Sequence, residues 1–427
     1  MTGMPPCVLL PIPGESVAQD TTEHQIIEGD NLAVITHLAQ SLAGQIKLIL
    51  IDPPYNTGKR FTYQDKRGEQ WTELMRPRLA VSRDLLREDG AIIVHIDEHE
   101  HSRLTLLLDE VFGADNRLGT IVWDKLNPKG DATGIACQHE IILCYAKDRA
   151  AYLATHPLRR DKAHVTAMLD EAKQLVKTHG SDIEGANAAF RKWIRGQSDL
   201  SGGEAAYSRI DEDGRVFQAV SMAWPNKRTP SQEYFRPLIH PQTGRPCPVP
   251  ARGWRNPPQT MDRLLSEGRI VFGPTERTQP RRRYFLDENR TEPIPSILRD
   301  GSSDDALLKA LGTPFDHAKP LSVTRRLVRW FTHAPGDVVL DFFAGSGTTG
   351  HAVLLENAAQ GMGLKMILVQ SDEPVVGESE AAAAGFSTVS ELTRARVRAA
   401  ISRLNADTPP RDGEDRGFVA TRLSQGK

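Results

Sequence analysis

Two short motifs in this sequence carry residue types that can do chemistry. The tetrapeptide Asp52-Pro53-Pro54-Tyr55 directly follows an apolar run over residues 47–51. At average residue usage, a fixed tetrapeptide occurs by chance in a chain of this length on the order of 0.3% of the time, so the motif is specific. Much later, the glycine-rich loop Phe343-Ala344-Gly345-Ser346-Gly347 follows a second apolar run. The first motif could hold a reacting group, and the second could hold a small ligand.

Together the two motifs resemble the amino-methyltransferases of DNA, which move a methyl group from S-adenosylmethionine to an exocyclic base nitrogen. The resemblance extends to the modification subunits of type III restriction systems and their solitary relatives. It rests on Ile26 to Leu32, Asp52 to Gly58, Ile96-Asp97-Glu98, His139-Glu140 and Asp341 to Gly350. It covers roughly residues 25–148 and 250–375 and fades between them. The resemblance implies a DNA methyltransferase acting on adenine N6, with S-adenosylmethionine as its cofactor.

The chemistry of such a reaction suits the first motif. An exocyclic amine is a poor nucleophile because its lone pair is delocalised into the ring, and two acceptors on its N–H bonds would localise that lone pair. The Asp52 side chain can supply one acceptor. The Pro53 carbonyl can supply the other, because consecutive prolines fix the backbone and remove competing N–H donors. Tyr55 can stack on a base taken out of the duplex, and Asp52 or water would accept the released proton.

The second motif is typical of a loop that binds a charged small molecule. It lies where a strand is expected to end and a helix to begin, so glycines allow close backbone approach and the helix offers unpaired N–H groups. A valine at Gly347 is therefore expected to block the ligand with its side chain. The spacing Gly345-x-Gly347-x-x-Gly350, with acids at 372 and 373, also fits a dinucleotide fingerprint. A nicotinamide-dependent oxidoreductase therefore remains an alternative.

The family resemblance assigns cofactor contacts to particular residues. It places Asp341 beside the amino group of the methionine part, and either Asp372 or Glu373 on the ribose hydroxyls. Lys319-Pro320 resembles a segment that reaches the methionine carboxylate, although it is also an ordinary helix start. Asp30 lies in a Gly-Asp turn expected beside the adenine ring, and a helix N-cap explains it equally well. The expected cofactor-binding residues are Asp30, Lys319, Pro320, Asp341, Phe343, Ala344, Gly345, Ser346, Gly347, Thr348, Asp372 and Glu373.

Several other charged segments invite a functional interpretation. The run Arg281-Arg282-Arg283 precedes two aromatic residues and suits contact with DNA phosphates, but acids at 287 and 288 also fit a solvated surface. Arg394, Arg396 and Arg398 are expected to form one face of a helix. Acids and histidines crowd residues 95–101, where the first turn of a helix explains the acids better than a metal site does. The expected reaction requires no metal.

Composition limits the class of protein. A chain of 427 residues suggests two or three domains. Hydrophobic and charged fractions of 39% and 25% are those of a soluble globular protein. The formal net charge of -2 means that a DNA-binding surface must be a local patch. The four cysteines form no CxxC pair and no segment has the length of a membrane span, which favours a cytoplasmic enzyme without membrane contact.

Alternating short apolar runs and amphipathic segments predict βαβ units. We expect strands at 47–51, 91–96, 119–123, 140–145, 338–342 and 366–369. We expect helices at 72–88, 98–111, 162–177, 184–194, 321–331, from the glycine loop to about 357, and at 390–405. Loops and short strands, rather than helices, are expected from 230 to 283.

The expected fold is α/β, with a doubly wound, mostly parallel sheet of the Rossmann-like methyltransferase type. Residues 20–150 would form the catalytic half and 315–405 the cofactor-binding half, an order that resembles the circularly permuted β arrangement of these enzymes. Residues 151–314 would recognise the target, and 406–427 would be a loose tail. The expected partner is double-stranded DNA, while a homodimer and a restriction subunit both stay open.

The target base is inferred from one residue. Asp at the first motif position favours adenine N6, because cytosine-N4 enzymes of the family more often begin with Ser. Cytosine N4 is the near alternative. A DNA-binding specificity subunit without activity is a further alternative, as is methylation of RNA or of protein glutamine, although glutamine enzymes usually carry Asn at this position.

Overall fold

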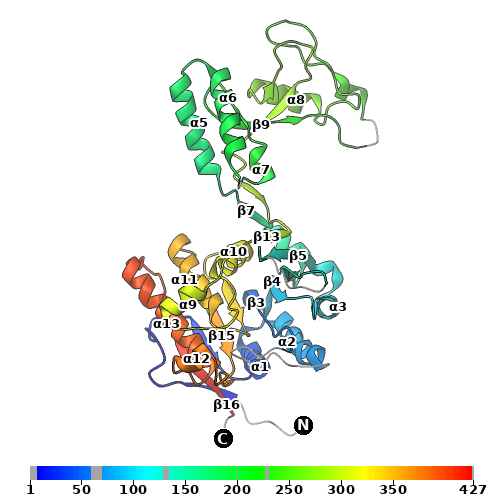
Figure 1. Cartoon of the computed structure of the whole chain (residues 1–427). Coiled ribbons are helices and arrows are strands. Elements are labelled where there is room, and N and C mark those ends of the chain that lie inside the picture. Colours follow the sequence, from blue (N-terminus) through cyan, green and yellow to red (C-terminus); the bar gives the residue numbers. More distant parts are fainter. Residues whose placement is uncertain (1–6, 59–69, 128–133, 199, 227–229, 426–427) are drawn as a thin grey trace. The chain divides into compact units, whose positions relative to one another are not determined.

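In the computed structural model (Figure 1), residues 7–58, 70–127, 134–198, 200–226 and 230–425 are described. The chain divides into two compact units. One comprises Met1–Leu158 with Ile294–Lys427, and the other comprises Arg159–Pro293. We call them the sheet unit and the inserted unit. The sheet unit carries both sequence motifs, and the inserted unit carries the arginine run.

The sheet unit is built on a ten-stranded sheet of order β1-β16-β2-β15-β14-β3-β4-β6-β5-β13. The strands are β1 (Cys7–Pro11), β2 (Gln25–Glu28), β3 (Ile46–Ile51), β4 (Leu86–Ile96), β5 (Arg117–Asp124), β6 (His139–Ala146), β13 (Ile297–Arg299), β14 (Val338–Asp341), β15 (Lys365–Gln370) and β16 (Val419–Gln425). All pairings from β16 to β4 are parallel, whereas β6 is antiparallel to both of its neighbours. The predicted mostly parallel sheet is confirmed.

Helices cover both faces of this sheet (Figure 1). One face packs against α1 (Asn31–Leu42), α2 (Trp71–Leu85) and α3 (His101–Phe112), and the other against α4 (Arg149–Thr155), α10 (Leu321–Phe331), α11 (Thr348–Gln360) and α13 (Val389–Asp407). Short elements are η2 (Ala114–Asn116), α9 (Asp305–Leu311) and α12 (Glu380–Ala383). Every residue of β3 is buried, since its side chains alternate between two covered faces.

The order of the strands brings the two sequence motifs together. β3 and β14 are parallel neighbours, with Leu48 beside Val339 and Ile49 beside Leu340. After β3 the chain continues through α2 to β4 on one side, whereas after β14 it continues through α11 to β15 on the other side. Ligands of open α/β sheets bind where neighbouring connections diverge in this way. Residues 52–55 and 342–347 follow these two strands, so both motifs reach one crevice.

The inserted unit has its own sheets and apolar clusters. Its elements are β7 (Arg159–Asp161), α5 (Val165–His179), α6 (Ile183–Gly196), α7 (Gly202–Ala205), β8 (Arg209–Ile210), β9 (Val216–Ser221), η3 (Gln232–Phe235), α8 (Pro258–Ser266), β10 (Ile270–Val271), β11 (Arg281–Phe285) and β12 (Thr291–Pro293). The helix α8 corrects the expectation of no helix there. Met261 and Leu264 are buried with Trp254, and a proline at its start favours a helix.

The tail predicted to be loose forms a strand inside the sheet. β16 pairs with β1 on one side and with β2 on the other. Phe418 and Ala420 are fully buried. The prediction was wrong because the polar average composition of residues 406–427 hides the short apolar run Phe418-Val419-Ala420, and such a run is consistent with a buried strand.

Two further boundaries differ from the predictions. Residues 151–158 and 294–314, predicted to belong to the recognition region, lie in the sheet unit, because α4 packs on the sheet and β13 extends it beside β5. The predicted helix over 72–88 ends at Leu85, since residues 86–88 already begin β4. In the described part of the chain, no helix is long and apolar enough to cross a membrane.

We predict that Phe418→Ala lowers the free energy of unfolding by about 3–5 kcal/mol, because it empties a fully buried aromatic site beside the sheet. Urea denaturation measures this change. Arg403→Ala, at a half-exposed helix position, is the control and should change stability by less than about 0.5 kcal/mol. Equal stability of Phe418→Ala and the parent chain would contradict the burial of Phe418 directly before β16.

Candidate functional site

Two cavities open at the crevice between β3 and β14. The first, of about 260 Å³, is surrounded by the glycine loop and the ends of β3, β14 and β15, and we call it the loop cavity. The second, of about 980 Å³, is lined by Tyr55, Trp123 and Glu140, and we call it the tyrosine cavity. Asp52, Phe315, His317, Ala318 and Lys319 line both. The residues shared by both cavities therefore include the motif aspartate.

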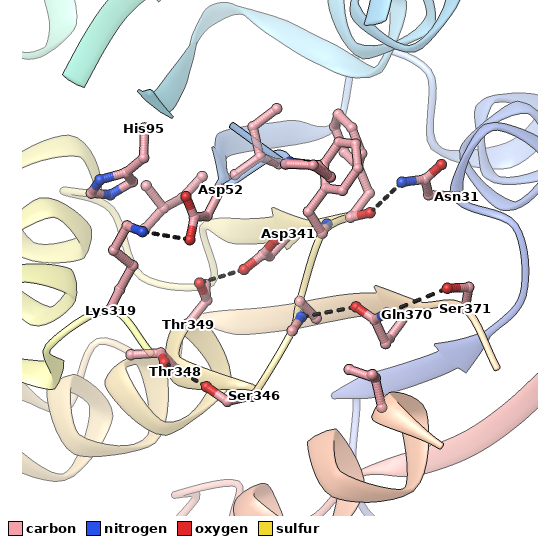
Figure 2. Close-up of a pocket in the computed structure, with 18 of the residues that line it drawn as sticks. Asn31, Asp52, His95, Lys319, Asp341, Ser346, Thr348, Thr349, Gln370 and Ser371 are labelled. Carbon is pink, nitrogen blue, oxygen red and sulfur yellow. Dashed lines mark hydrogen bonds and ion pairs between the residues drawn. The ribbon is translucent and has the colours of Figure 1, made fainter. Parts of the chain in front are cut away.

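Asp52 follows β3 and holds one bound and one unbound carboxylate oxygen. Its Oδ2 lies 2.7 Å from the Lys319 ammonium, and Figure 2 shows this pair beside His95. Its Oδ1 is buried and has no hydrogen-bond partner among the described residues. Leaving a buried acceptor unpaired costs free energy, so such an atom is characteristic of a site that receives a donor from a ligand. Asp52 is thus equipped to accept one hydrogen bond.

Tyr55 is held by buried charges at the edge of the tyrosine cavity. Its hydroxyl donates to Glu140 at 2.9 Å, and the Lys319 ammonium lies 4.7 Å from the centre of its ring. Burial, together with the charges of Asp52 and Glu140, raises the pKa of Tyr55 well above its usual value, so the phenol stays neutral. Burial would raise the pKa of Glu140, but the ammonium groups of Lys319 and Lys125 outweigh it and lower the pKa to about 2. Glu140 is therefore a fixed anion that orients the Tyr55 hydroxyl.

The two prolines of the motif are buried within a braced loop. The Trp71 indole N–H donates to the Pro54 carbonyl at 2.7 Å. This bond occupies one of the two proline carbonyls and ties Pro54 to the start of α2. Pro54 lines the loop cavity and Pro53 lines neither cavity, so the Pro53 carbonyl as second acceptor for an amine stays a prediction.

Asp341 ends β14 and faces the loop cavity. It accepts a hydrogen bond from the Thr349 hydroxyl at 2.6 Å (Figure 2). It also accepts one from the Phe343 N–H at 3.0 Å. Burial is the main cause that raises the pKa of this carboxyl to about 7, with a smaller contribution from Asp52. His95, buried across the cavity, has its pKa lowered to about 4 by burial and is neutral. A cationic ligand group would find a carboxyl ready to ionise.

The glycine loop is tied to neighbouring elements by its backbone. Gly345 has a φ of +51°, donates to the Gln370 side chain at 2.9 Å and accepts from Thr393 at 2.6 Å. Gly347 has a φ of +83°, and a Cβ there would lie 3.1 Å from the Thr393 carbonyl. Gly347 does not line the loop cavity, so the expected blocking by a valine side chain is corrected. A valine would instead strain the loop against α13.

The remaining predicted cofactor residues divide between the two cavities. Phe343, Ala344, Ser346 and Thr348 line the loop cavity with Gly345, and Pro320 lines the tyrosine cavity. Asp30 caps α1 by accepting from the Ala33 N–H at 3.0 Å, and it also lines the loop cavity, so its position beside an adenine ring stays a prediction. Glu373 lines the loop cavity, whereas Asp372 does not. The geometry therefore favours Glu373 of the two acids.

The arginine run lies on β11 of the inserted unit. Because side chains alternate along a strand, Arg281 and Arg283 share one face and Arg282 lies on the other. The Arg283 guanidinium lies 3.5 Å from Glu212 and 3.8 Å from Asp211. Arg281 is exposed, and Arg282 stacks at 4.4 Å over the Tyr284 ring. The run therefore does not act as one patch, and Arg281 is its most accessible cation.

The crowded acids and histidines of residues 95–101 also separate in space. His95 is buried beside Asp52, whereas Asp97 lies 2.8 Å from the exposed His99. Glu98 lies 3.0 Å from His139, and ligand atoms of these two and of Cys137 are within 4.8 Å of one another. The residues of the run thus have distinct neighbours and do not form one cluster.

Several cavity residues were not identified by sequence reasoning. Asn31 donates to the Phe342 carbonyl at 3.0 Å, and its own oxygen accepts from Arg78 at 2.6 Å. Gln370 holds the glycine loop from the end of β15. A signal was available for Gln370, because it ends the strand that follows the loop and the ends of such strands meet at one edge. His95 is predictable in the same way, one residue from the end of β4.

The sequence is similar to known proteins over most of its length. A family model described as DNA methylase matches residues 46–373. The chain is 32% identical over 424 residues to the Mod subunit of the type III restriction-modification enzyme EcoP15I of Escherichia coli, covering 90% of this chain and 64% of that protein. It is 26% identical to the StyLTI Mod subunit of Salmonella typhimurium, covering 96% and 62%. The chain thus spans less than two thirds of the length of these two relatives.

A third relative has a more similar length. The type II methyltransferase M.KpnI of Klebsiella pneumoniae is 28% identical, with 90% of this chain and 88% of that protein covered. The family match speaks against the nicotinamide-dependent oxidoreductase considered from the glycine spacing. Because the family model matches more than half of the sequence, the chain belongs to the N6/N4 DNA methylase family.

Proposed function

We propose that this protein transfers a methyl group from S-adenosylmethionine to an exocyclic amine of a base in DNA, with N6 of adenine as the target. The observation that carries the proposal is the position of Asp52, which lines both cavities and keeps a buried oxygen without a partner among the described residues. An amine entering from the tyrosine cavity would meet Asp52 at the border of the loop cavity. The relatives named Mod subunits and type II methyltransferases agree with this activity.

The donor set of the loop cavity fits S-adenosylmethionine. When bound, this cofactor supplies an electrophilic methyl group on a sulfonium. Asp341 would hold its ammonium group, and Glu373 its ribose hydroxyls. The glycine loop and the N-terminus of α11 would take the methionine part, since the first N–H groups of a helix have no partner within it.

The residues of the tyrosine cavity would hold the target base. Asp52 Oδ1 and the Pro53 carbonyl would accept the two N–H bonds and direct the lone pair at the methyl group. Tyr55 would stack on the base, with its hydroxyl held by Glu140. The Lys319 ammonium would balance the Asp52 carboxylate. Asp52 or water would take the proton that the methylated nitrogen loses.

Target recognition is assigned to the inserted unit. Arg281, with an exposed side chain, would contact the DNA phosphates, and Arg282 and Arg283 would contribute less because of their neighbours in the unit. The Mod relatives raise the prospect of a restriction subunit as a second partner, and a homodimer stays a prediction. A cytoplasmic location also stays a prediction.

Adenine is preferred over cytosine because the motif begins with Asp and because the relatives include Mod subunits. Long-read sequencing of DNA from a methylation-free host that expresses the chain would identify both the base and its sequence context. N6-methyladenine at one recurring sequence is the expected result. Detection of N4-methylcytosine would show that cytosine N4, and not adenine N6, is the target. Unmodified DNA would contradict the proposed activity.

We predict that Asp52→Ala lowers the rate of methyl transfer at least about 100-fold, because the base amine loses a fixed acceptor in the transition state. Transfer of a labelled methyl group to DNA measures this rate. Calorimetric affinity for S-adenosylmethionine should stay close to that of the parent chain. Asp407→Ala, on an exposed helix end, is the control and should transfer at the parent rate. Near-parent transfer by Asp52→Ala would overturn the mechanism.

A second prediction concerns pH. Since burial raises the pKa of Asp341 to about 7, its carboxyl is protonated below that pH in the free protein. Affinity for the cationic cofactor should therefore weaken by up to about tenfold per pH unit as the pH falls below about 7. Asp341→Asn should bind more weakly at pH 8 and lose this pH dependence. Calorimetry at pH 5.5 to 8 tests this, and an unchanged pH dependence in the variant would refute it.

Thermal stability without cofactor provides an independent check of the Asp341 carboxyl. An acid whose pKa is higher in the folded state loses stability as pH rises from its unfolded to its folded pKa. The parent chain should therefore lose stability through Asp341 between about pH 4 and 7, whereas Asp341→Asn should not. The variant is expected to gain thermal stability relative to the parent as the pH rises to 8.

A further inference from the structure

A buried ion pair lies behind the glycine loop, outside both cavities. Arg396 of α13 is fully buried, and one of its terminal nitrogens lies 2.9 Å from Asp304. Asp304 also accepts from the Leu321 N–H at 3.0 and 3.1 Å, at the start of α10. The sequence suggested only a helix face for Arg396, yet its side chain is completely enclosed. A buried charge needs a reason, because desolvating an ion pair is costly.

The second terminal nitrogen of Arg396 faces the glycine loop. It donates to the Ser346 hydroxyl at 2.8 Å and to the Thr348 hydroxyl at 2.7 Å. A guanidinium has donors only, so both hydroxyls must act as acceptors toward it. Their own protons must therefore point elsewhere.

The proton count of the two hydroxyls has a consequence for the cavity. Ser346 and Thr348 lie 3.1 Å apart, and Figure 2 shows this contact. Only one hydroxyl proton can lie between the two oxygens. The proton of the other hydroxyl must therefore point away from this contact. Both side chains line the loop cavity. Arg396 thus turns one of these hydroxyls into a donor toward a ligand, with a buried positive charge directly behind it.

From this geometry we propose that Ser346 and Thr348 bind the carboxylate of the methionine part and that Arg396 is the positioning residue that makes them donors. Asp304 neutralises the far side of the guanidinium and links it to α10, so the positive end of the pair faces the loop. The inference rests on the proposed function, because the carboxylate belongs to S-adenosylmethionine. It also differs from the prediction that Lys319 binds this carboxylate, because the Lys319 ammonium forms an ion pair with Asp52.

The test compares S-adenosylmethionine with decarboxylated S-adenosylmethionine, which keeps the ammonium group and lacks only the carboxylate. Calorimetry gives the two affinities for the full chain and for each variant. In the parent chain we expect the carboxylate to strengthen binding at least about tenfold. The double variant Ser346→Ala, Thr348→Val should lose about tenfold in affinity for S-adenosylmethionine and stay within about twofold for the decarboxylated ligand. This variant leaves the buried ion pair in place.

The role of Arg396 is tested by two substitutions. Arg396→Met should remove the same preference for the carboxylate, and Arg396→Lys should restore part of it, because an ammonium can still donate to the loop. Thermal unfolding of each variant checks that the chain folds. If Arg396→Met does not fold, the hydroxyl double variant alone decides the outcome. Lys319→Met is the matched control and should keep the preference.

Three results would overturn the inference alone. An equal loss of affinity for both ligands in the hydroxyl double variant would indicate that these hydroxyls only support the loop. Loss of the carboxylate preference in Lys319→Met, with the preference retained in the double variant, would give the carboxylate to Lys319. Equal affinity of the parent chain for both ligands would remove the inference while leaving the proposed function intact. Failure of the parent chain to bind either ligand would instead refute the proposed function and, with it, this inference.

Discussion

The site depends on the parallel pairing of β3 with β14, strands that lie far apart in the sequence. Their register sets Leu48 beside Val339 and Ile49 beside Leu340, so the residues that follow each strand emerge at the same edge of the sheet. The helices that follow them lead away in opposite directions, to β4 and to β15. Backbone pairing alone therefore brings Asp52 and Asp341 to one crevice, which the surrounding side chains then line.

Charge then divides this crevice into regions with different chemistry. Beside Tyr55, the ammonium groups of Lys319 and Lys125 form ion pairs with the carboxylates of Asp52 and Glu140, so the charges balance one another. Around the glycine loop, burial raises the pKa of the Asp341 carboxyl to about 7, so this carboxyl ionises less readily than an exposed one, and a bound cation would favour its ionised form. A polar target and a cationic ligand would thus meet surfaces of different kinds, with Asp52 between them.

Much of the fold could be predicted because local patterns determine it. The apolar run of β3 and the sequence after it place Asp52 at the end of a buried strand, and the glycine loop marks the start of α11. The strand near the end of the chain was missed. β16 is part of the sheet although its composition is that of a tail, because its partners β1 and β2 are distant in sequence. Pairing over such distances has no local signature.

The candidate site was only partly predictable for the same reason. Motif residues such as Asp52 and Gly345 were found from their spacing and from the family resemblance. Arg396 was not, because its role depends on where α13 packs and on the hydroxyls that it meets there. Side chains that support a site carry no motif of their own, and only the packed structure shows what they contact.

We propose that Asp52 and the glycine loop face one ligand in the crevice between β3 and β14. The most direct test of this proposal is a crystal structure of the full chain with sinefungin, a cofactor analogue that carries an amine where S-adenosylmethionine carries its methyl group. We predict that the analogue fills the loop cavity, with its amino acid end at Asp341 and Ser346 and its added amine directed toward Asp52. Sinefungin bound elsewhere, or bound in the loop cavity with this amine directed away from Asp52, would contradict the account.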